Sequence, residues 1–411
     1  MNRRLLLLAL VTHAFCRAQV PPSRLSPRAA LDLANAAADQ RIQIYEATLK
    51  TKPDNLPAEI GLTSACLQKL RESGDGAYLD RAAKLVDTML RQDGGSLISL
   101  RLQNEVDLQR HEFKAVADRS RDLIRFSPSD PGVWANLGDA SMELGAYDDA
   151  GKAYLKMFAL RPNLASYNRL AYFRFVTGDV PNAIFLMKSA VESGDSQPEN
   201  IAWCLAELGD MYFKTGSIEE AQRAFRSAID IFPTLHRALA GLGRIAASEK
   251  QFDVAIAYYK RAQSIVPLVE YAFVLEDLYT AAGQPGRARE QQSLVDVIEQ
   301  LGAVKNERTN RNLALGLAEH DRNLPEALRL IEAELPSRGD VYTWDAYSWI
   351  LFKCGRIPEA RSASSKALKL QTPEPLFYYH AGKIALTIGD TEAAHGYMTR
   401  LMSLNPRFNV Q

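Results

Sequence analysis

Reactive side chains are spread thinly along this chain. The sequence contains no GxSxG, HExxH, GxxxxGK[ST] or GxGxxG motif, so no nucleophile, metal-ligand pair or phosphate-binding loop stands at the spacing its chemistry needs. His320 stands beside Asp321, but neighbouring residues of a helix point in different directions. The other histidines lie in separate parts of the sequence: His13, His111, His236, His380 and His395. We predict a protein without catalytic, cofactor-binding or metal-binding residues.

The cysteines and the paired carboxylates have structural explanations. Cys66, Cys204 and Cys354 include no CxxC pair, which argues against both a zinc site and a disulfide framework. We expect them to be small core residues. The acidic pairs at 148–149 and 219–220 stand where helices begin, so helix-dipole interactions account for them.

The elements that would position any site follow a repeat of 34 residues. Leu205, Leu208, Gly209, Tyr212, Ala221, Phe225, Ala228 and Pro233 recur as Leu239, Leu242, Gly243, Ala246, Ala255, Tyr259, Ala262 and Pro267. Within one unit these residues form two helical stripes separated by a turn at Gly216. Ser217 and Glu220 form a possible capping box for the second helix. The small residues Gly209 and Ala221 allow the two helices to approach closely. Each unit is thus a helical hairpin that needs a neighbour to cover its apolar faces.

The order of residues in each unit resembles the tetratricopeptide repeat. That resemblance implies an all-α fold, an α-solenoid in which antiparallel helix pairs form a right-handed superhelix. The predicted pairs span 97–130, 131–164, 165–198, 202–235, 236–268, 269–303, 307–340, 341–374 and 375–408. We divide the chain into residues 19–96 with a divergent pair, an array at 97–303 and C-terminal units at 304–411. A polar stretch at 303–310 is predicted to be a flexible joint.

The first residues predict export. Arg3 and Arg4 precede an apolar run, and Cys16 and Ala18 offer a cleavage site before two prolines, so residues 1–18 read as a signal peptide. Export would place the protein in the periplasm or outside the cell, with lipid attachment at Cys16 as a minor option. No later run is long enough to span a membrane. The segment from Asn312 to Pro406 also resembles the end of exported bacterial tetratricopeptide proteins, on residues that include 340–342 and 379–382.

Composition narrows the class of partner. The 411 residues are 47% hydrophobic, which is typical of a globular chain with two to three domains or one elongated array. Lys plus Arg total 49 and Asp plus Glu total 49, so no overall field attracts nucleic acid. A protein or peptide partner is therefore favoured.

The resemblance indicates where such a partner would bind. In tetratricopeptide arrays the first helix of each pair lines the concave side, and aromatic residues and arginine are the usual anchors of protein interfaces. The alternative for each aromatic, Phe175 and Phe352 above all, is a contact that seals neighbouring pairs. Some family members clamp a terminal carboxylate, but Ala206, Asp210, Ala240 and Arg244 do not form that clamp. The predicted partner-binding residues are Tyr172, Phe175, Trp203, Asp210, Phe213, Arg237, Arg244, Tyr342, Trp349, Phe352, Tyr379 and Lys383.

The leading hypothesis is thus an exported, non-catalytic scaffold that binds a protein or peptide in its groove. One alternative is an enzyme, or an enzyme subunit, with an unrecognised active site in that groove. Another is a homo-oligomer that associates through exposed residues of its last unit, such as Leu376 and Tyr379.

Overall fold

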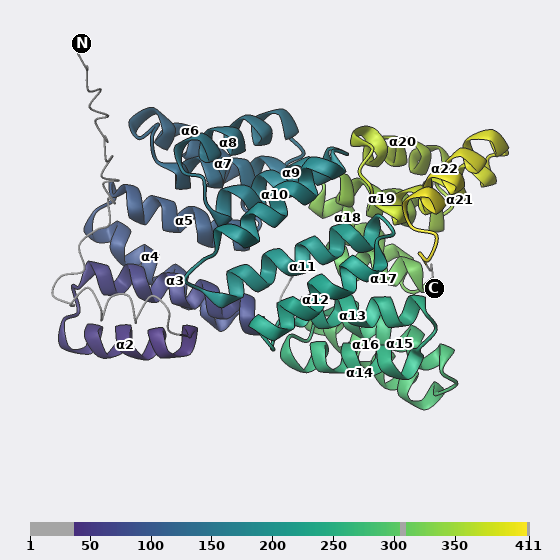
Figure 1. Cartoon of the computed structure of the whole chain (residues 1–411), viewed down its shortest axis with the longest axis horizontal. Coiled ribbons are helices and arrows are strands. Elements are labelled where there is room, and N and C mark those ends of the chain that lie inside the picture. The colour runs from purple at the N-terminus through teal and green to yellow at the C-terminus, as the bar shows by residue number, and fades with distance from the viewer. Residues whose placement is uncertain (1–36, 305–309, 409–411) are drawn as a thin grey trace, which may run out of the picture.

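The computed structural model describes residues 37–304 and 310–408 (Figure 1). Within these ranges every regular element is a helix and none is a strand, so the predicted all-α class is confirmed. The predicted signal peptide, Cys16 and residues 305–309 of the predicted joint lie outside the described residues. The division of the chain at residues 96 and 303 stays a prediction.

The helices follow one another as antiparallel pairs joined by short turns. Their bounds are α2 (Ala38–Thr51), α3 (Leu56–Ser73), α4 (Ala77–Gln92), α5 (Leu97–Gln109), α6 (Phe113–Phe126), α7 (Pro131–Glu143), α8 (Tyr147–Leu160), α9 (Leu164–Val176), α10 (Val180–Ser193), α11 (Pro198–Lys214), α12 (Ile218–Ile231), α13 (His236–Ser248), α14 (Phe252–Ile265), α15 (Val269–Ala281), α16 (Pro285–Val304), α17 (Arg311–Glu319), α18 (Leu324–Glu334), α19 (Val341–Lys353), α20 (Ile357–Ala367), the 3₁₀ turn η1 (Leu368–Leu370), α21 (Pro375–Thr387) and α22 (Thr391–Leu404). The predicted hairpins from residue 97 onward match observed pairs, except that α11 begins at Pro198, four residues before the predicted start at 202. Residues 307–309 of one predicted pair lie outside the described residues.

The hairpin of α11 and α12 shows why small residues recur in the repeat. A Cβ atom added to Gly209 would lie 2.6 Å from Cε1 of Phe225, closer than real Cβ contacts, and Phe225 is fully buried. Ala221 is also fully buried in the same cluster. The close approach predicted for this pair is confirmed.

The predicted capping box at Ser217 is wrong. Ser217 is the N-cap of α12, but its side chain makes no capping hydrogen bond. Its backbone N–H donates instead to the carbonyl of Tyr212, at 2.9 Å, as part of the turn that ends α11 through Gly216. Glu220 therefore cannot accept that N–H, and its carboxylate pairs with Arg223.

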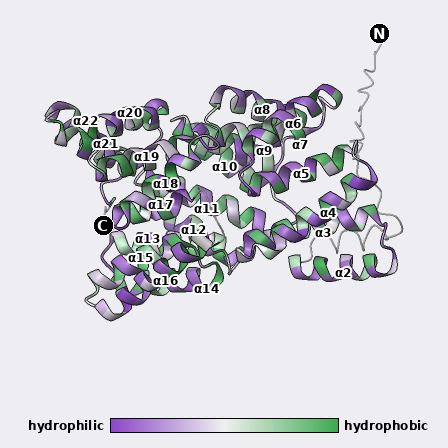
Figure 2. Ribbon diagram, turned by 180° about the vertical axis from the view of Figure 1, so that it is seen from behind, coloured by the Kyte–Doolittle hydropathy of each residue, from purple (hydrophilic) through white to green (hydrophobic). Residues whose placement is uncertain are grey.

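Apolar clusters link each pair to the next. Ala206 on α11, Phe225 on α12 and Leu242 on α13 belong to one buried cluster. Apolar and polar residues alternate along the helices (Figure 2), which is the striping expected when one face of each helix is buried. The hydrophobic core is therefore continuous along the array of helix pairs, as in an α-solenoid.

The solenoid curves until segments about 195 residues apart meet, with α17–α22 returning to the side of α7–α11 (Figure 1). Three contacts join the start of α8 and the ends of α9 and α11 to segments near or after the later helices α19, α20 and α22. The Tyr147 hydroxyl accepts from the N–H of Val341 at 2.9 Å. The Thr372 hydroxyl donates to the carbonyl of Val176, and the Asn405 amide donates to that of Phe213, both at 2.7 Å.

Backbone approach at this contact requires a residue without a side chain. Gly216 has φ +79°, and a Cβ atom there would lie 2.8 Å from the carbonyl oxygen of Leu404. Two successive turns of the solenoid therefore touch, and we call this region the contact between turns. It consists of residues 143–147 with 338–341, 176–178 with 370–372, and 213–216 with 404–405.

Candidate protein-binding cavity

A cavity of about 590 Å³ lies on the inner surface, where the two turns face each other. Inner helices α7, α9, α11 and α13 supply one side of its lining, and Arg311, Arg338 and Tyr342 supply the other. The lining on the first side includes Asp139, Glu143, Asn168, Arg169, Tyr172, Phe175, Trp203, Glu207, Asp210, Lys214 and Arg237. We call this space the central cavity.

One end of the cavity wall is an ion pair with an aromatic neighbour. Arg169 binds both oxygens of Asp139, with Nε at 2.8 Å from Oδ1 and Nη2 at 2.9 Å from Oδ2. Tyr154 donates its hydroxyl to the same carboxylate at 2.8 Å. Burial opposes the charge of Arg169, but the Asp139 carboxylate outweighs it and raises the pKa of the guanidinium. Asp139 is thus fully engaged within the chain.

The next part of the wall alternates arginines with carboxylates. Arg237 contacts Glu207 at 2.7 Å and Asp210 at 3.4 Å, and Arg244 also binds Asp210. Burial by itself would raise the pKa of Asp210, but the guanidiniums of Arg244 and Arg237 outweigh it and lower that pKa. The guanidinium of Arg237 lies 4.4 Å from the ring centroid of Trp203, a cation–π distance.

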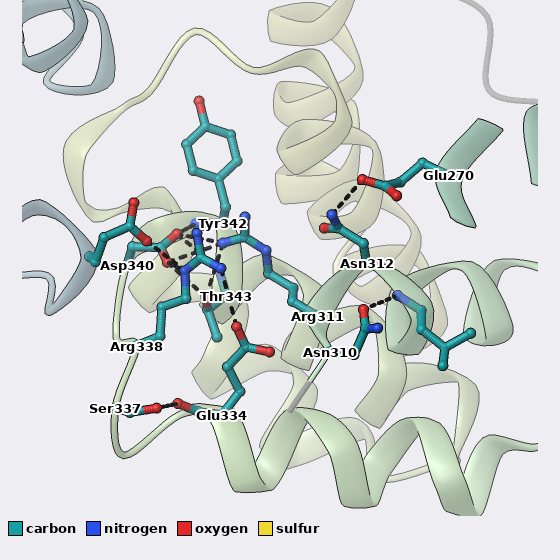
Figure 3. A network of polar contacts seen from close by, with 12 residues as sticks. Glu270, Asn310, Arg311, Asn312, Glu334, Ser337, Arg338, Asp340, Tyr342 and Thr343 are labelled. Carbon is teal, nitrogen blue, oxygen red and sulfur yellow. Dashed lines mark hydrogen bonds and ion pairs between the residues drawn. The ribbon is translucent and has the colours of Figure 1, made fainter. Parts of the chain in front are cut away.

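The opposite side carries a network around Arg338 and Arg311 (Figure 3). Nε of Arg338 lies 2.6 Å from the Glu143 carboxylate across the contact between turns, and Nη1 lies 3.2 Å from Glu334. Nη1 of Arg311 is 3.1 Å from both oxygens of Asp340. Burial raises the pKa of Glu143, although Arg338 opposes that shift.

Asp340 has a second task in this network. Its Oδ1 accepts the backbone N–H groups of Tyr342 at 2.8 Å and Thr343 at 3.1 Å, so it is the N-cap of α19. The Tyr342 ring is directed away from these carboxylates (Figure 3) and lines the central cavity.

The structure brings half of the predicted partner-binding residues into the central cavity. They are Tyr172, Phe175, Trp203, Asp210, Arg237 and Tyr342. Phe213 and Arg244 line a separate space of about 190 Å³ that Phe408 also borders. Phe175 and Phe213 are almost fully buried, as the alternative of sealing contacts implies.

The remaining predicted residues gather on α19 and α21, away from the central cavity. Trp349 is 6% exposed and stacks on two rings, with centroid distances of 4.2 Å to His380 and 5.0 Å to Phe352. His380 is 1% exposed and contacts Asp345 at 2.9 Å, so this group is a packed core element. Tyr379 packs against the same ring, and Lys383 lies half-buried one turn further along α21.

Sequence reasoning missed Arg169, Glu207, Lys214, Arg311 and Arg338 as lining residues. Lys214 directly follows the predicted inward residue Phe213 on α11. Placing the inward position one residue later in that turn of the helix would have identified Lys214. Arg338 stands in the loop before α19, and no local pattern marks a loop residue that meets α7 from about 195 positions away.

The described residues offer little for metal or thiol chemistry. In ranges 37–304 and 310–408, no group of three His, Cys, Asp or Glu side chains is placed to hold a metal ion. Burial raises the pKa of the Cys204 thiol to about 12 and also raises that of Cys66. Among the described helices, none combines the length and apolar character needed to cross a membrane.

Comparison with known proteins identifies the repeat. Models of the tetratricopeptide repeat match residues 131–164 and 206–269. The chain is 21% identical over 355 residues to the Protein CTR9 homolog of Arabidopsis thaliana, covering 75% of this chain and 32% of that protein. It is 26% identical over 149 residues to the BBSome complex member BBS4 of Bos taurus, covering 36% and 28% respectively. The chain thus spans about a third of the length of these relatives.

One solved structure supports the fold. The crystal structure of the APC/C hetero-tetramer Cut9–Hcn1 matches with a TM-score of 0.51 and 13% identity, over 87% of this chain and 62% of that chain. The predicted resemblance to exported bacterial proteins is untested by these matches and stays a prediction.

Proposed function

We propose that this tetratricopeptide repeat protein is a non-catalytic scaffold that binds an extended segment of a partner protein in its central cavity. The observation that carries the proposal is the cavity itself, which brings Tyr172, Trp203 and Tyr342 from distant helices into one lining. Its volume of about 590 Å³ is in the range of specific ligand sites. One of the relatives named above is a member of a multi-protein complex, the BBSome, which supports a role in protein interaction.

The aromatic lining suits a peptide. Tyrosine and tryptophan side chains supply large contact areas at small entropic cost and dominate the binding energy of many protein interfaces. Tyr172 on α9, Trp203 on α11 and Tyr342 on α19 are partly exposed, so part of each side chain is accessible to a bound segment. One face of the Trp203 ring is covered by the Arg237 guanidinium. A partner that touches all three would bridge the contact between turns.

The charged lining favours binding over catalysis. A general base needs a carboxylate or imidazole within hydrogen-bond reach of substrate and with its own proton-accepting site open. Asp139 and Asp210 instead bind arginines of the same chain. An enzyme with its site in the cavity is the competing hypothesis, and turnover abolished by the isosteric change Glu143→Gln would favour it.

Selection from a displayed random-peptide library tests the proposal. The best selected peptide is synthesised and titrated against wild type, Tyr172→Ala and the matched control Tyr258→Ala. Tyr258 is a half-buried tyrosine of α14 that packs against neighbouring helices and does not line the central cavity. We expect Tyr172→Ala to weaken binding by more than about 2 kcal/mol, roughly thirtyfold, and Tyr258→Ala to leave it nearly unchanged. Equal affinities for wild type and Tyr172→Ala would contradict the proposal.

Export to the periplasm or the extracellular space remains part of the proposal, and the signal-like residues 1–18 support it. Fractionation of cells that express the full chain tests it, because an uncleaved chain in the cytoplasm would argue against export. Self-association is the remaining alternative, and light scattering on the purified chain distinguishes a monomer from an oligomer.

A further inference from the structure

We infer that the partner segment held in the central cavity is uncharged, a stretch of main chain with neutral polar and apolar side chains. The inference rests on the proposed function, because it specifies the partner of the same cavity. Its basis is the difference between the charged and the neutral groups of the lining.

The charged groups of the lining are already neutralised within the chain. Lys214, for example, holds Glu374 with Nζ 2.7 Å from Oε2, across the contact between turns. The pairs that account for the other charged lining residues are Asp139–Arg169, Glu143–Arg338, Glu207–Arg237, Asp210–Arg237 and Arg311–Asp340. The inner wall thus presents ion pairs in place of free charges.

A charged ligand would have to displace a partner from one of these pairs. Glu374 and Asp340, which hold Lys214 and Arg311, have side chains only 11% and 9% exposed. A displaced carboxylate would stay buried without its cation, and an uncompensated buried charge costs several kcal/mol. Since the ligand would also lose its own hydration, exchange of one ion pair for another gives no net gain.

The groups that remain unpaired are neutral. In the described part of the chain, the hydroxyls of Tyr172 and Tyr342, the indole N–H of Trp203 and the amide of Asn168 line the cavity without a hydrogen-bond partner. Burial raises the pKa of both tyrosines well above its ordinary value, so the hydroxyls stay protonated.

These neutral groups match the chemistry of a peptide backbone. Hydroxyl and amide side chains offer both donors and acceptors, as do the N–H and C=O groups of an extended chain. The faces of the aromatic rings suit apolar side chains. Arg244, a cation on an inward helix position, is bound to Asp210 and is therefore not free to hold a terminal carboxylate.

The library selection described above, analysed by composition, tests the inference. We expect cavity-binding peptides to be depleted in Asp, Glu, Lys and Arg relative to the unselected library. Their affinity should change by less than about threefold between about 50 mM and about 500 mM salt, because screening acts only on net charge interactions. Replacing one central uncharged residue of the best peptide with Asp or with Lys should weaken binding at least about tenfold.

A charge-release variant gives the matched control. Glu374→Gln keeps the shape of the side chain but frees Lys214, so the Asp-bearing peptide should recover affinity for this variant while the parent peptide should not change. Circular dichroism verifies that the variant is folded. If it is not, Asp340→Asn, which keeps an oxygen to cap α19 but frees Arg311, provides the same comparison.

The possible outcomes separate the two proposals. Charged peptides whose binding is lost in Tyr172→Ala would overturn the inference and leave the proposed function intact. A selection that yields no peptide sensitive to Tyr172→Ala would overturn both. Neutral peptides sensitive to Tyr172→Ala, together with recovery of the Asp-bearing peptide in Glu374→Gln, would support both.

Discussion

Replacement of Arg338 by glutamine should loosen the contact between turns. Its guanidinium reaches Glu143 on α7, Glu334 on α18 and Asp340 before α19, at 2.6, 3.2 and 3.3 Å. The Arg338 side chain is 17% exposed, while those of Glu334 and Asp340 are 2% and 9% exposed. Loss of the cation therefore leaves carboxylates with little access to water.

The size of the effect follows from that burial. Removing one partner of a buried ion pair costs about 3 to 5 kcal/mol. Asp340 keeps Arg311, and the Glu143 side chain is 31% exposed, so we expect the lower end, about 3 kcal/mol. Urea unfolding followed by circular dichroism measures the loss. Small-angle X-ray scattering should show a larger radius of gyration if the turns separate.

The matched control is Arg329→Gln, because Arg329 contacts Glu326 at 2.6 Å but is 50% exposed. Such surface pairs contribute about 0 to 1 kcal/mol. If Arg338→Gln lowers stability no more than Arg329→Gln, the contact between turns does not stabilise the closed array. The double variant Glu143→Gln, Arg338→Gln should lose less stability than the sum of the two single changes, because it removes the Glu143 carboxylate together with the cation that neutralises it.

Three further changes test the packing, the pH dependence and a helix cap. Gly209→Ala should cost about 1 to 3 kcal/mol in urea unfolding, because the new methyl group meets the enclosed Phe225 ring. Burial, assisted by Arg237, lowers the pKa of His236 to about 4 from an unfolded value near 6.5. The unfolded chain binds the proton first as pH falls through this window, so the free energy of unfolding should drop by up to roughly 3 kcal/mol, and His236→Gln should reduce that drop. Asp130→Ala should cost about 1 to 2 kcal/mol, because the Asp130 carboxylate caps α7.

Each of these changes has a comparison that can contradict it. Gly286→Ala on α16 adds a methyl group that meets nothing within 4 Å, and a loss as large as that of Gly209→Ala would refute the packing argument. An acid-induced loss of stability as large in His236→Gln as in wild type would show that His236 does not cause it. An unchanged urea midpoint in Asp130→Ala would show that this cap does not stabilise α7.

Local periodicity made the helices predictable. The stripe of Leu205, Leu208 and Tyr212 and the stop at Gly216 depend on residues within one turn or two of each other. The observed α11 and α12 end where those signals stand. The capping-box prediction failed because the backbone N–H of Ser217 donates to the carbonyl of Tyr212 and not to the Glu220 side chain. Turn geometry makes that choice, and residue types do not specify it.

Some inward positions on neighbouring pairs were also predictable, because helix periodicity and the repeat fix which side of a first helix faces the groove, although Phe213 and Arg244 line a separate space. Trp203 and Arg237, 34 residues apart, lie in the same lining and stack on each other. Tyr342 shows the limit. Sequence position grouped it with Trp349 and Phe352, whereas the structure places it beside Tyr172 in the central cavity.

The sequence by itself determined the helical hairpins, their order and the small residues that let them pack, because all of these depend on side chains close in the chain. Only the tertiary structure decided that the array closes on itself, that Arg338 meets Glu143, and that the cavity's charges pair within the chain. The reason is cumulative geometry. Each pair rotates slightly on the last, so whether segments about 195 residues apart meet depends on the sum of many small angles.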